Sequence, residues 1–204
     1  KNGAKFVFDI FDFLYGEPQG FIQKCVKKIQ IGIINRADAT IICTEEREKQ
    51  IEGSSPRRLT VIHNTPATVQ AGKLCMDIGD SDKVRIVYVG ILQDYRLLKE
   101  VAECVRESDN MELHIGGFGK YEDYFECMSQ ESEDIKYYGR LSYEQTLSLE
   151  RLCDVMLAIY DPTIENHRFA APNKFYESLM IGKPVVMVKR TGMSQIVEQN
   201  EIGV

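Results

Sequence analysis

A lysine and a glutamate three residues apart form the pair in this sequence whose spacing points most directly to chemistry. Lys174 and Glu177 lie in a helical pattern that predicts a helix over Asn173–Ile181, so their side chains share one face. Gly182 follows the last helical residue and ends the helix, as capping preferences expect. A helix amino terminus attracts phosphate. We therefore expect the cation to face a diphosphate and the carboxylate to face a ribose diol.

Two buried strands and a polar loop must position this pair. The apolar runs at 155–159 and 184–188 predict strands on either side of the helix, and residues 160–172 form the loop that precedes it. In an open parallel sheet, ligands bind beyond the carboxyl ends of the strands. The segment therefore predicts a nucleotide site at that edge.

The same alternation of strands and helices precedes this segment. It predicts strands at 84–89, 111–115 and 135–138, and helices at 94–107, 121–130 and 143–152. Ser142 and Gln145 form a predicted capping box at the start of the last of these helices. Five strands separated by helices predict an α/β fold with a doubly wound, Rossmann-like parallel sheet.

The first third of the chain predicts part of a second α/β domain. Strands are expected at 5–10, 39–43 and 59–63, with a helix at 20–36. The stretch that follows lacks periodicity and contains proline and glycine, so we expect a linker at 67–82. The predicted domains are then 1–66 and 83–204.

The helix that carries Lys174 and Glu177 resembles the donor-binding element of retaining GT-B glycosyltransferases, glycosyltransferase family 4 (group 1). The family pattern is a glutamate, seven residues, a second glutamate and a G-x-P-V-V turn, and Glu177 with GKPVV resembles its second half. Pro172, Asn173 and Lys174 resemble the P-N-K run of members that assemble polysaccharides.

The first glutamate of this pattern has no counterpart, because Phe169 occupies its position. The resemblance assigns that glutamate to the donor sugar. Glu165, Asn166 and His167 are the candidates to replace it, and His167 is expected to touch the donor.

Three segments of the first third also resemble this family. FDIFDF (8–13), RADATIICTEE (36–46) and LTVIHNTP (59–66) resemble its "D-x-x-D", "A-D-x-I-x-x-x-S" and "V-x-V-I-P-N-G" segments in order. The resemblance implies the second half of an amino-terminal, acceptor-side domain followed by most of a donor domain. We therefore expect a part of a longer enzyme that does not transfer sugar by itself.

Further donor-binding residues are expected at the ends of the predicted strands. Gly90 begins a loop in which the family carries an arginine and a lysine, and Arg96 is expected to reach the diphosphate in their place. The IGGFG run predicts a tight turn near the ligand at Gly117. Arg140 lies in a segment that we expect to contact the base of the donor nucleotide.

The resemblance implies a glycosyltransferase that uses a UDP- or GDP-linked sugar and retains anomeric configuration, with no cofactor and no metal. The acceptor would be a saccharide or a lipid-linked saccharide in surface polysaccharide synthesis. Two alternatives stay open: a nucleotide-sugar epimerase of the same fold, and a non-catalytic subunit that binds a nucleotide sugar.

Composition narrows the partners further. A net charge of −6 argues against binding nucleic acid through its phosphates. Six scattered cysteines without a C-x-x-C pair indicate buried thiols in a reducing compartment, not a zinc site or a disulfide framework. No apolar run reaches the roughly 18 residues of a membrane span, so a cytoplasmic location is the default.

Two interactions of the first third are left open. Lys24, Lys27, Lys28 and Arg36 give the helix at 20–36 a basic side that would meet anionic lipid at the inner membrane face, although a solvated face is favoured. The edge of the partial sheet would also pair with another chain and form a dimer.

Overall fold

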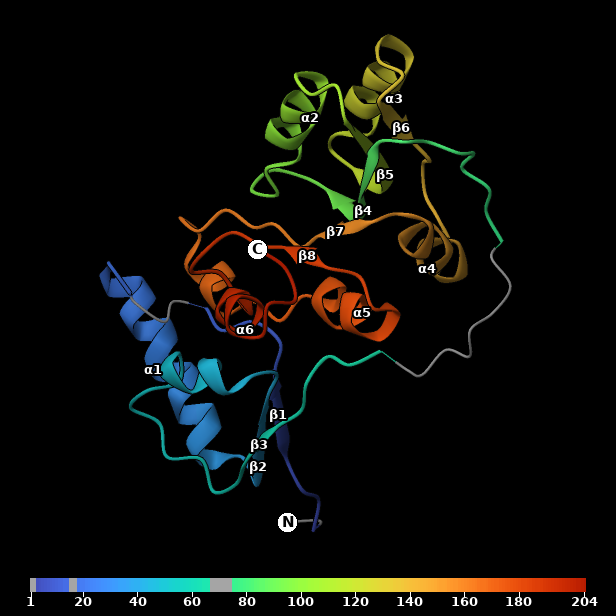
Figure 1. Cartoon of the computed structure of the whole chain (residues 1–204). Helices are drawn as coiled ribbons and strands as arrows, with labels where there is room; N and C mark the ends of the chain where they lie inside the picture. Colours follow the sequence, from blue (N-terminus) through green and yellow to red (C-terminus); the bar gives the residue numbers. More distant parts are fainter. Residues whose placement is uncertain (1–2, 15–17, 67–74) are drawn as a thin grey trace.

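The computed structural model describes residues 3–14, 18–66 and 75–204, which form two parallel sheets with helices packed around them (Figure 1). The smaller sheet has the order β1-β2-β3. Its strands are β1 (Val7–Ile10), β2 (Ala39–Ile42) and β3 (Leu59–Val61). Helix α1 (Phe21–Arg36) connects β1 to β2, and the short helix η1 (Glu45–Lys49) follows β2.

The larger sheet contains five parallel strands in the order β6-β5-β4-β7-β8, with helices on both faces. The strands are β4 (Val84–Leu92), β5 (Met111–Gly119), β6 (Ile135–Tyr137), β7 (Val155–Leu157) and β8 (Val185–Val186). The helices are α2 (Leu98–Arg106), α3 (Glu122–Glu131), α4 (Tyr143–Leu152), η2 (Glu165–Phe169), α5 (Asn173–Ile181) and α6 (Ser194–Gln199).

The two faces of this sheet belong to two separate apolar clusters. Val87 and Met156 point into a cluster with residues of α4, α5 and α6, whereas Tyr88 and Leu157 point into one with α2 and α3. Neighbouring strand residues alternate between faces, so each strand buries both of its sides. The doubly wound α/β fold predicted from the sequence is confirmed.

The glycine-rich run after the second predicted strand is the clearest difference from expectation. Strand β5 continues through the IGGFG run to Gly119 and stays paired with β4, so the predicted tight turn at 116–119 is wrong. A Cβ atom on Gly117 would lie 1.8 Å from the carbonyl oxygen of Gly90, and Gly117 has a φ of +130°. Glycine permits this close approach and backbone conformation, and therefore extends the strand instead of ending it.

The helix expected at 94–107 begins four residues later than predicted, at Leu98. Tyr95 and Leu97 adopt left-handed backbone conformations, with φ of 64° and 52°. Residues in this conformation do not continue an α-helix. Arg96 therefore lies in a loop and not in the first turn of a helix.

The remaining helices and strands agree closely with the predicted ones. Helix α5 has the predicted bounds and ends at Gly182 with φ of 70°, and the Ser142–Gln145 capping box is present at α4. The predicted linker lies partly outside the described residues; its described part, 75–82, contains no helix or strand. The two proposed domain limits stay predictions.

Two other expectations meet the structure here. Four of the six cysteines are exposed and only Cys43 and Cys153 are buried, so the expectation of mostly buried thiols is wrong. Across the three described ranges, each helix is too short or too polar to cross a lipid bilayer. Contact of α1 with a membrane surface and a dimer through the small sheet stay predictions.

Candidate active site

A cavity of about 340 Å³ opens at the carboxyl ends of β4 and β5, beside the start of α5. Its walls come from both strand ends, the segment before α4, the first turn of α4 and α5. The lining residues are Val89, Gly90, Gly117, Phe118, Arg140, Leu141, Tyr143, Thr146, Asn173, Lys174 and Glu177. Six of the eight predicted donor-binding residues therefore line one cavity; the other two, Arg96 and His167, lie outside this lining.

The ammonium group of Lys174 is a cation without a neutralising contact at this cavity. Nζ lies 4.6 Å from the centre of the Tyr88 ring. Among the described residues, no carboxylate oxygen lies within 4.0 Å of it. A cation that lines a cavity and rests on an aromatic face is available to an anionic ligand.

The backbone of Gly90 makes room for this ammonium group. A Cβ atom at Gly90 would lie 2.7 Å from Lys174 Nζ and 3.3 Å from the Tyr88 hydroxyl. Any side chain at this position would therefore displace the lysine tip. Gly90 was predicted as a donor-binding residue that begins a loop; the loop start is wrong, because β4 continues to Leu92, and the small size of the glycine is what matters for the site.

Glu177 is the acidic member of the pair and is 7% exposed. Burial raises the pKa of its carboxyl group, and the charge of Lys174 and the hydroxyl of Tyr143 oppose this rise. A carboxylate that lines a cavity next to a cation can accept hydrogen bonds from the two hydroxyl groups of a sugar diol. The helical spacing that predicted a shared face is confirmed, since both side chains line the same cavity.

Sequence reasoning missed a second buried acid behind this wall. Glu150 lies on α4, one turn after Thr146, and is 1% exposed. Its Oε2 atom has no hydrogen-bond partner. Burial and then the charge of Glu177 raise the pKa of Glu150 to about 8, although Lys174 opposes them. The available signal was a glutamate three residues after the buried Leu147, on the apolar side of a predicted helix.

Arg96 provides a second cation close to the cavity without lining it. Its guanidinium carbon lies 4.1 Å from the centre of the Tyr160 ring, and its Nε and Nη1 atoms are buried with no hydrogen-bond partner. Burial lowers the pKa of both Lys174 and His167, and the positive charge of Arg96 adds to this fall, which places the three groups within electrostatic range. Buried nitrogen donors in proteins usually have a hydrogen-bond partner, so these two atoms of Arg96 are exceptions.

His167 is held by its own loop. The Nδ1–H group donates to the carbonyl oxygen of Asp161 at 2.8 Å, and the ring packs edge-on against Tyr160. Burial lowers the pKa of this histidine. The neighbouring Asn166 donates from Nδ2 to a carboxylate oxygen of Asp12 at 2.5 Å. The hydrogen bond between Asn166 and Asp12 joins the loop before α5 to the first third of the chain.

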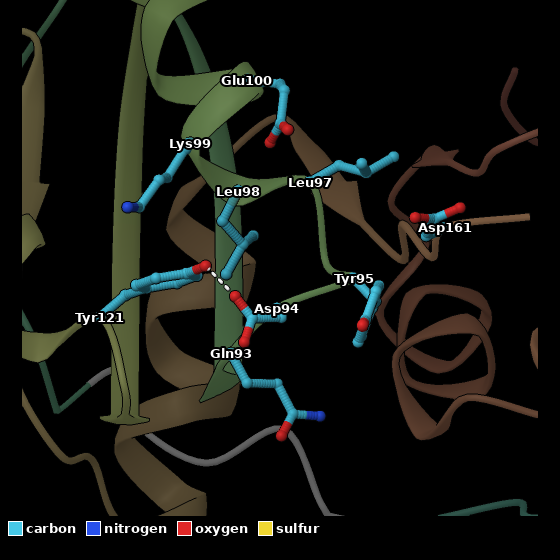
Figure 2. Close-up of a pocket in the computed structure, with 9 residues that line it drawn as sticks. All are labelled: Gln93, Asp94, Tyr95, Leu97, Leu98, Lys99, Glu100, Tyr121 and Asp161. Atoms are coloured by element: carbon cyan, nitrogen blue, oxygen red, sulfur yellow. Dashed lines mark hydrogen bonds between the residues drawn. The ribbon is translucent and has the colours of Figure 1, made fainter. Parts of the chain in front are cut away.

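A second cavity, of about 280 Å³, lies next to the loop that carries Arg96 (Figure 2). In Figure 2 the carboxylate of Asp94 points to the hydroxyl of Tyr121. Lys120 also binds Asp94, at 2.7 Å. Asp94 therefore already has a cation and a hydroxyl group as partners. By contrast, the ammonium group in the Lys174 cavity has no described carboxylate oxygen within 4.0 Å.

Two kinds of similarity to known proteins agree with this geometry. A family model described as glycosyl transferases group 1 matches residues 83–204, which include all residues that line the Lys174 cavity. A comparison with curated protein sequences found no match.

Solved structures match almost the whole chain. TarM from S. aureus matches with a TM-score of 0.68 at 19% identity, over 99% of this chain and 40% of TarM. HepE from Anabaena, in complex with UDP, matches with a TM-score of 0.67 at 18% identity, over 98% of this chain and 57% of HepE.

WaaG, a glycosyltransferase involved in lipopolysaccharide biosynthesis, has a TM-score of 0.65 at 12% identity, over 98% of this chain and 61% of WaaG. The chain thus spans less than two thirds of each of these three structures, which share its GT-B type of fold. Since the family model covers more than half of the chain, the protein belongs to the glycosyl transferases group 1 family.

Proposed function

We propose that the chain is the donor-binding part of a retaining glycosyltransferase of family 4 that moves a sugar from a nucleoside diphosphate to a saccharide or lipid-linked acceptor. The observation that carries this proposal is the ammonium of Lys174, which lines the cavity beside Gly90 without a direct ion pair to a described residue. In this proposal the ammonium binds the diphosphate and Glu177 accepts hydrogen bonds from the ribose. HepE, whose structure contains UDP, and WaaG, which is involved in lipopolysaccharide biosynthesis, support the donor class and the surface-polysaccharide pathway.

The proposed chemistry depends on stabilising a leaving group. A nucleotide sugar already carries its activated leaving group, so the protein must orient the sugar and stabilise the negative charge that grows on the departing diphosphate. Lys174 and Arg96 are the cations in range, and Asn173, the first residue of α5, also lines the cavity. No metal ion is needed for this charge stabilisation in the proposed mechanism.

Arg140 and His167 have different places in this proposal. The guanidinium of Arg140 lies 4.6 Å from the centre of the Phe118 ring, and both residues line the cavity. We assign this cation and ring to the nucleoside end of the donor. His167 lies outside the cavity lining and is assigned to the loop that adjoins the donor sugar.

Calorimetric titration with UDP and GDP tests the proposal. Lys174→Met keeps the length of the side chain and removes its charge, and we expect a loss of roughly 10- to 100-fold in affinity because a charge-assisted contact is lost. Lys189→Met is the matched control, since that lysine is 83% exposed and binds Glu198 on α6. Equal affinity of both variants and the parent would remove Lys174 from the site.

A further inference from the structure

Behind the proposed donor site, α4 and α5 bring two buried carboxyl groups and one ammonium group together. Glu150 approaches from α4, and Lys174 and Glu177 from α5. Burial lowers the pKa of Lys174, and the two carboxyl groups oppose this fall; burial likewise raises the pKa of both carboxyl groups, and Lys174 opposes this rise. Tyr143, at the start of α4, faces the same pair of acids. Among the described residues, the titratable groups that face Glu150 are therefore Lys174, Glu177 and Tyr143.

Glu150 differs from Glu177 in its access to the cavity. Glu177 lines the cavity, whereas Glu150 lies behind the wall, with its Oε2 atom enclosed and without a hydrogen-bond partner. A buried carboxylate without hydrogen bonds is strongly disfavoured, so the neutral acid is the stable form of Glu150 near neutral pH. The residue therefore stays uncharged until the solution becomes alkaline, at about pH 8.

The charge of Glu150 changes how much of the positive charge of Lys174 is left for a ligand, next to the positive charge of Arg140 in the same cavity lining. With Glu150 neutral, the ammonium of Lys174 is balanced only by Glu177. With Glu150 ionised, two carboxylates surround one ammonium, and the cluster becomes net negative. A diphosphate that enters the cavity adds further negative charge at short range and is repelled by the second carboxylate.

We propose that Glu150 is a positioning residue that acts through Lys174: as a neutral acid it leaves the ammonium free for a diphosphate, and as a carboxylate it withdraws the ammonium from the ligand. The inference rests on the proposed function and adds a proton to its binding step. Donor binding then requires a protonated Glu150, and above about pH 8 the site takes up a proton when the diphosphate enters.

Titration of the parent chain with UDP and with GDP at pH 7 and pH 9 tests this inference. The terminal phosphate has a pKa of about 6 and keeps a constant charge over most of this range. We expect the affinity of the parent to fall roughly five- to tenfold from pH 7 to pH 9 as Glu150 loses its proton. At pH 8, titrations in two buffers with different ionisation enthalpies are expected to show an uptake of roughly half a proton.

Two variants separate Glu150 from the other groups. In Glu150→Gln the fall in affinity is expected to shrink to about twofold or less, because the side chain at position 150 then has no proton to lose. Glu144→Gln is the matched control, since Glu144 lies on the same helix but is exposed. It is expected to behave like the parent.

The outcomes distinguish this inference from the proposed function. An equal fall in the parent and in Glu150→Gln, or no proton uptake by the parent at pH 8, would overturn the role of Glu150 while leaving the donor site in place. Absence of any UDP or GDP binding at pH 7 would overturn the proposed function itself, and the inference with it.

Discussion

Replacing Glu150 by glutamine is expected to stabilise the protein at alkaline pH and to leave its stability at acid pH nearly unchanged. In the unfolded chain this carboxyl group titrates near its ordinary pKa of 4.5, whereas in the folded protein it keeps its proton up to about pH 8. Between these values the folded state binds more protons than the unfolded state. The free energy of unfolding therefore decreases as pH rises from 4.5 to 8, and changes little above that.

The size of this effect follows from the pKa difference. A difference of one in pKa corresponds to about 1.4 kcal/mol, so the interval between 4.5 and 8 sets an upper limit of about 5 kcal/mol. Glu177 and Lys174 interact with Glu150, so part of this free energy belongs to the three groups together and not to Glu150 alone. We therefore expect Glu150→Gln to gain about 2 to 4 kcal/mol over the parent between pH 5 and pH 8.5.

Urea unfolding at several pH values between 5 and 8.5 measures this gain. Glutamine has nearly the volume of glutamic acid, so the packing of α4 is retained in the variant. Glu144→Gln, on the exposed side of the same helix, controls for the loss of one negative charge. A Glu150→Gln curve that runs parallel to the parent over the whole pH range would refute a neutral, buried Glu150.

Two further substitutions and a change of metal content test the site and the strands that position it. Gly90→Ala should weaken UDP or GDP binding roughly tenfold, because its methyl group would occupy the place of Lys174 Nζ, while Gly32→Ala, which meets no atom within 4 Å, should bind like the parent. Gly117→Ala should lower the free energy of unfolding by more than about 3 kcal/mol in urea titrations, because its Cβ would lie 1.8 Å from a backbone oxygen at φ of +130°. Nucleotide affinity should agree within about twofold with EDTA and with magnesium in solution, because protein cations supply the charge; a strict metal requirement would contradict the proposed site.

The parts of the fold that could be predicted are those with strong local patterns. Helix α5 has an apolar period, a proline before its first residue and a left-handed glycine after its last, so both ends were predicted correctly. The capping box of α4 was likewise predicted correctly from its two residues, Ser142 and Gln145. Lys174 and Glu177 come together in the structure because their three-residue spacing within one helix brings them together in any fold.

The parts that could not be predicted depend on contacts between distant residues. The IGGFG run looks like a turn in isolation, and only its close approach to β4 makes it a strand. Leu97 ends the loop that carries Arg96 and has a left-handed backbone conformation, which leucine rarely adopts. Tertiary packing overrode the local preferences in both places.

Glu150 was missed for a related reason. Its sequence position is that of an ordinary helical glutamate, and its burial depends on tertiary packing that the local pattern does not encode. The position of Arg96 likewise became clear only with Tyr160, which lies 64 residues later in the sequence and provides the aromatic surface under the guanidinium group.

A crystal structure of the chain with bound UDP or GDP tests the central claim most directly. We expect the diphosphate to lie within hydrogen-bond distance of Lys174 Nζ, beside the backbone of Gly90, and a ribose hydroxyl to donate to the Glu177 carboxylate. A nucleotide bound instead in the cavity next to Asp94 and Tyr121, with the Lys174 cavity empty, would contradict the proposed donor site.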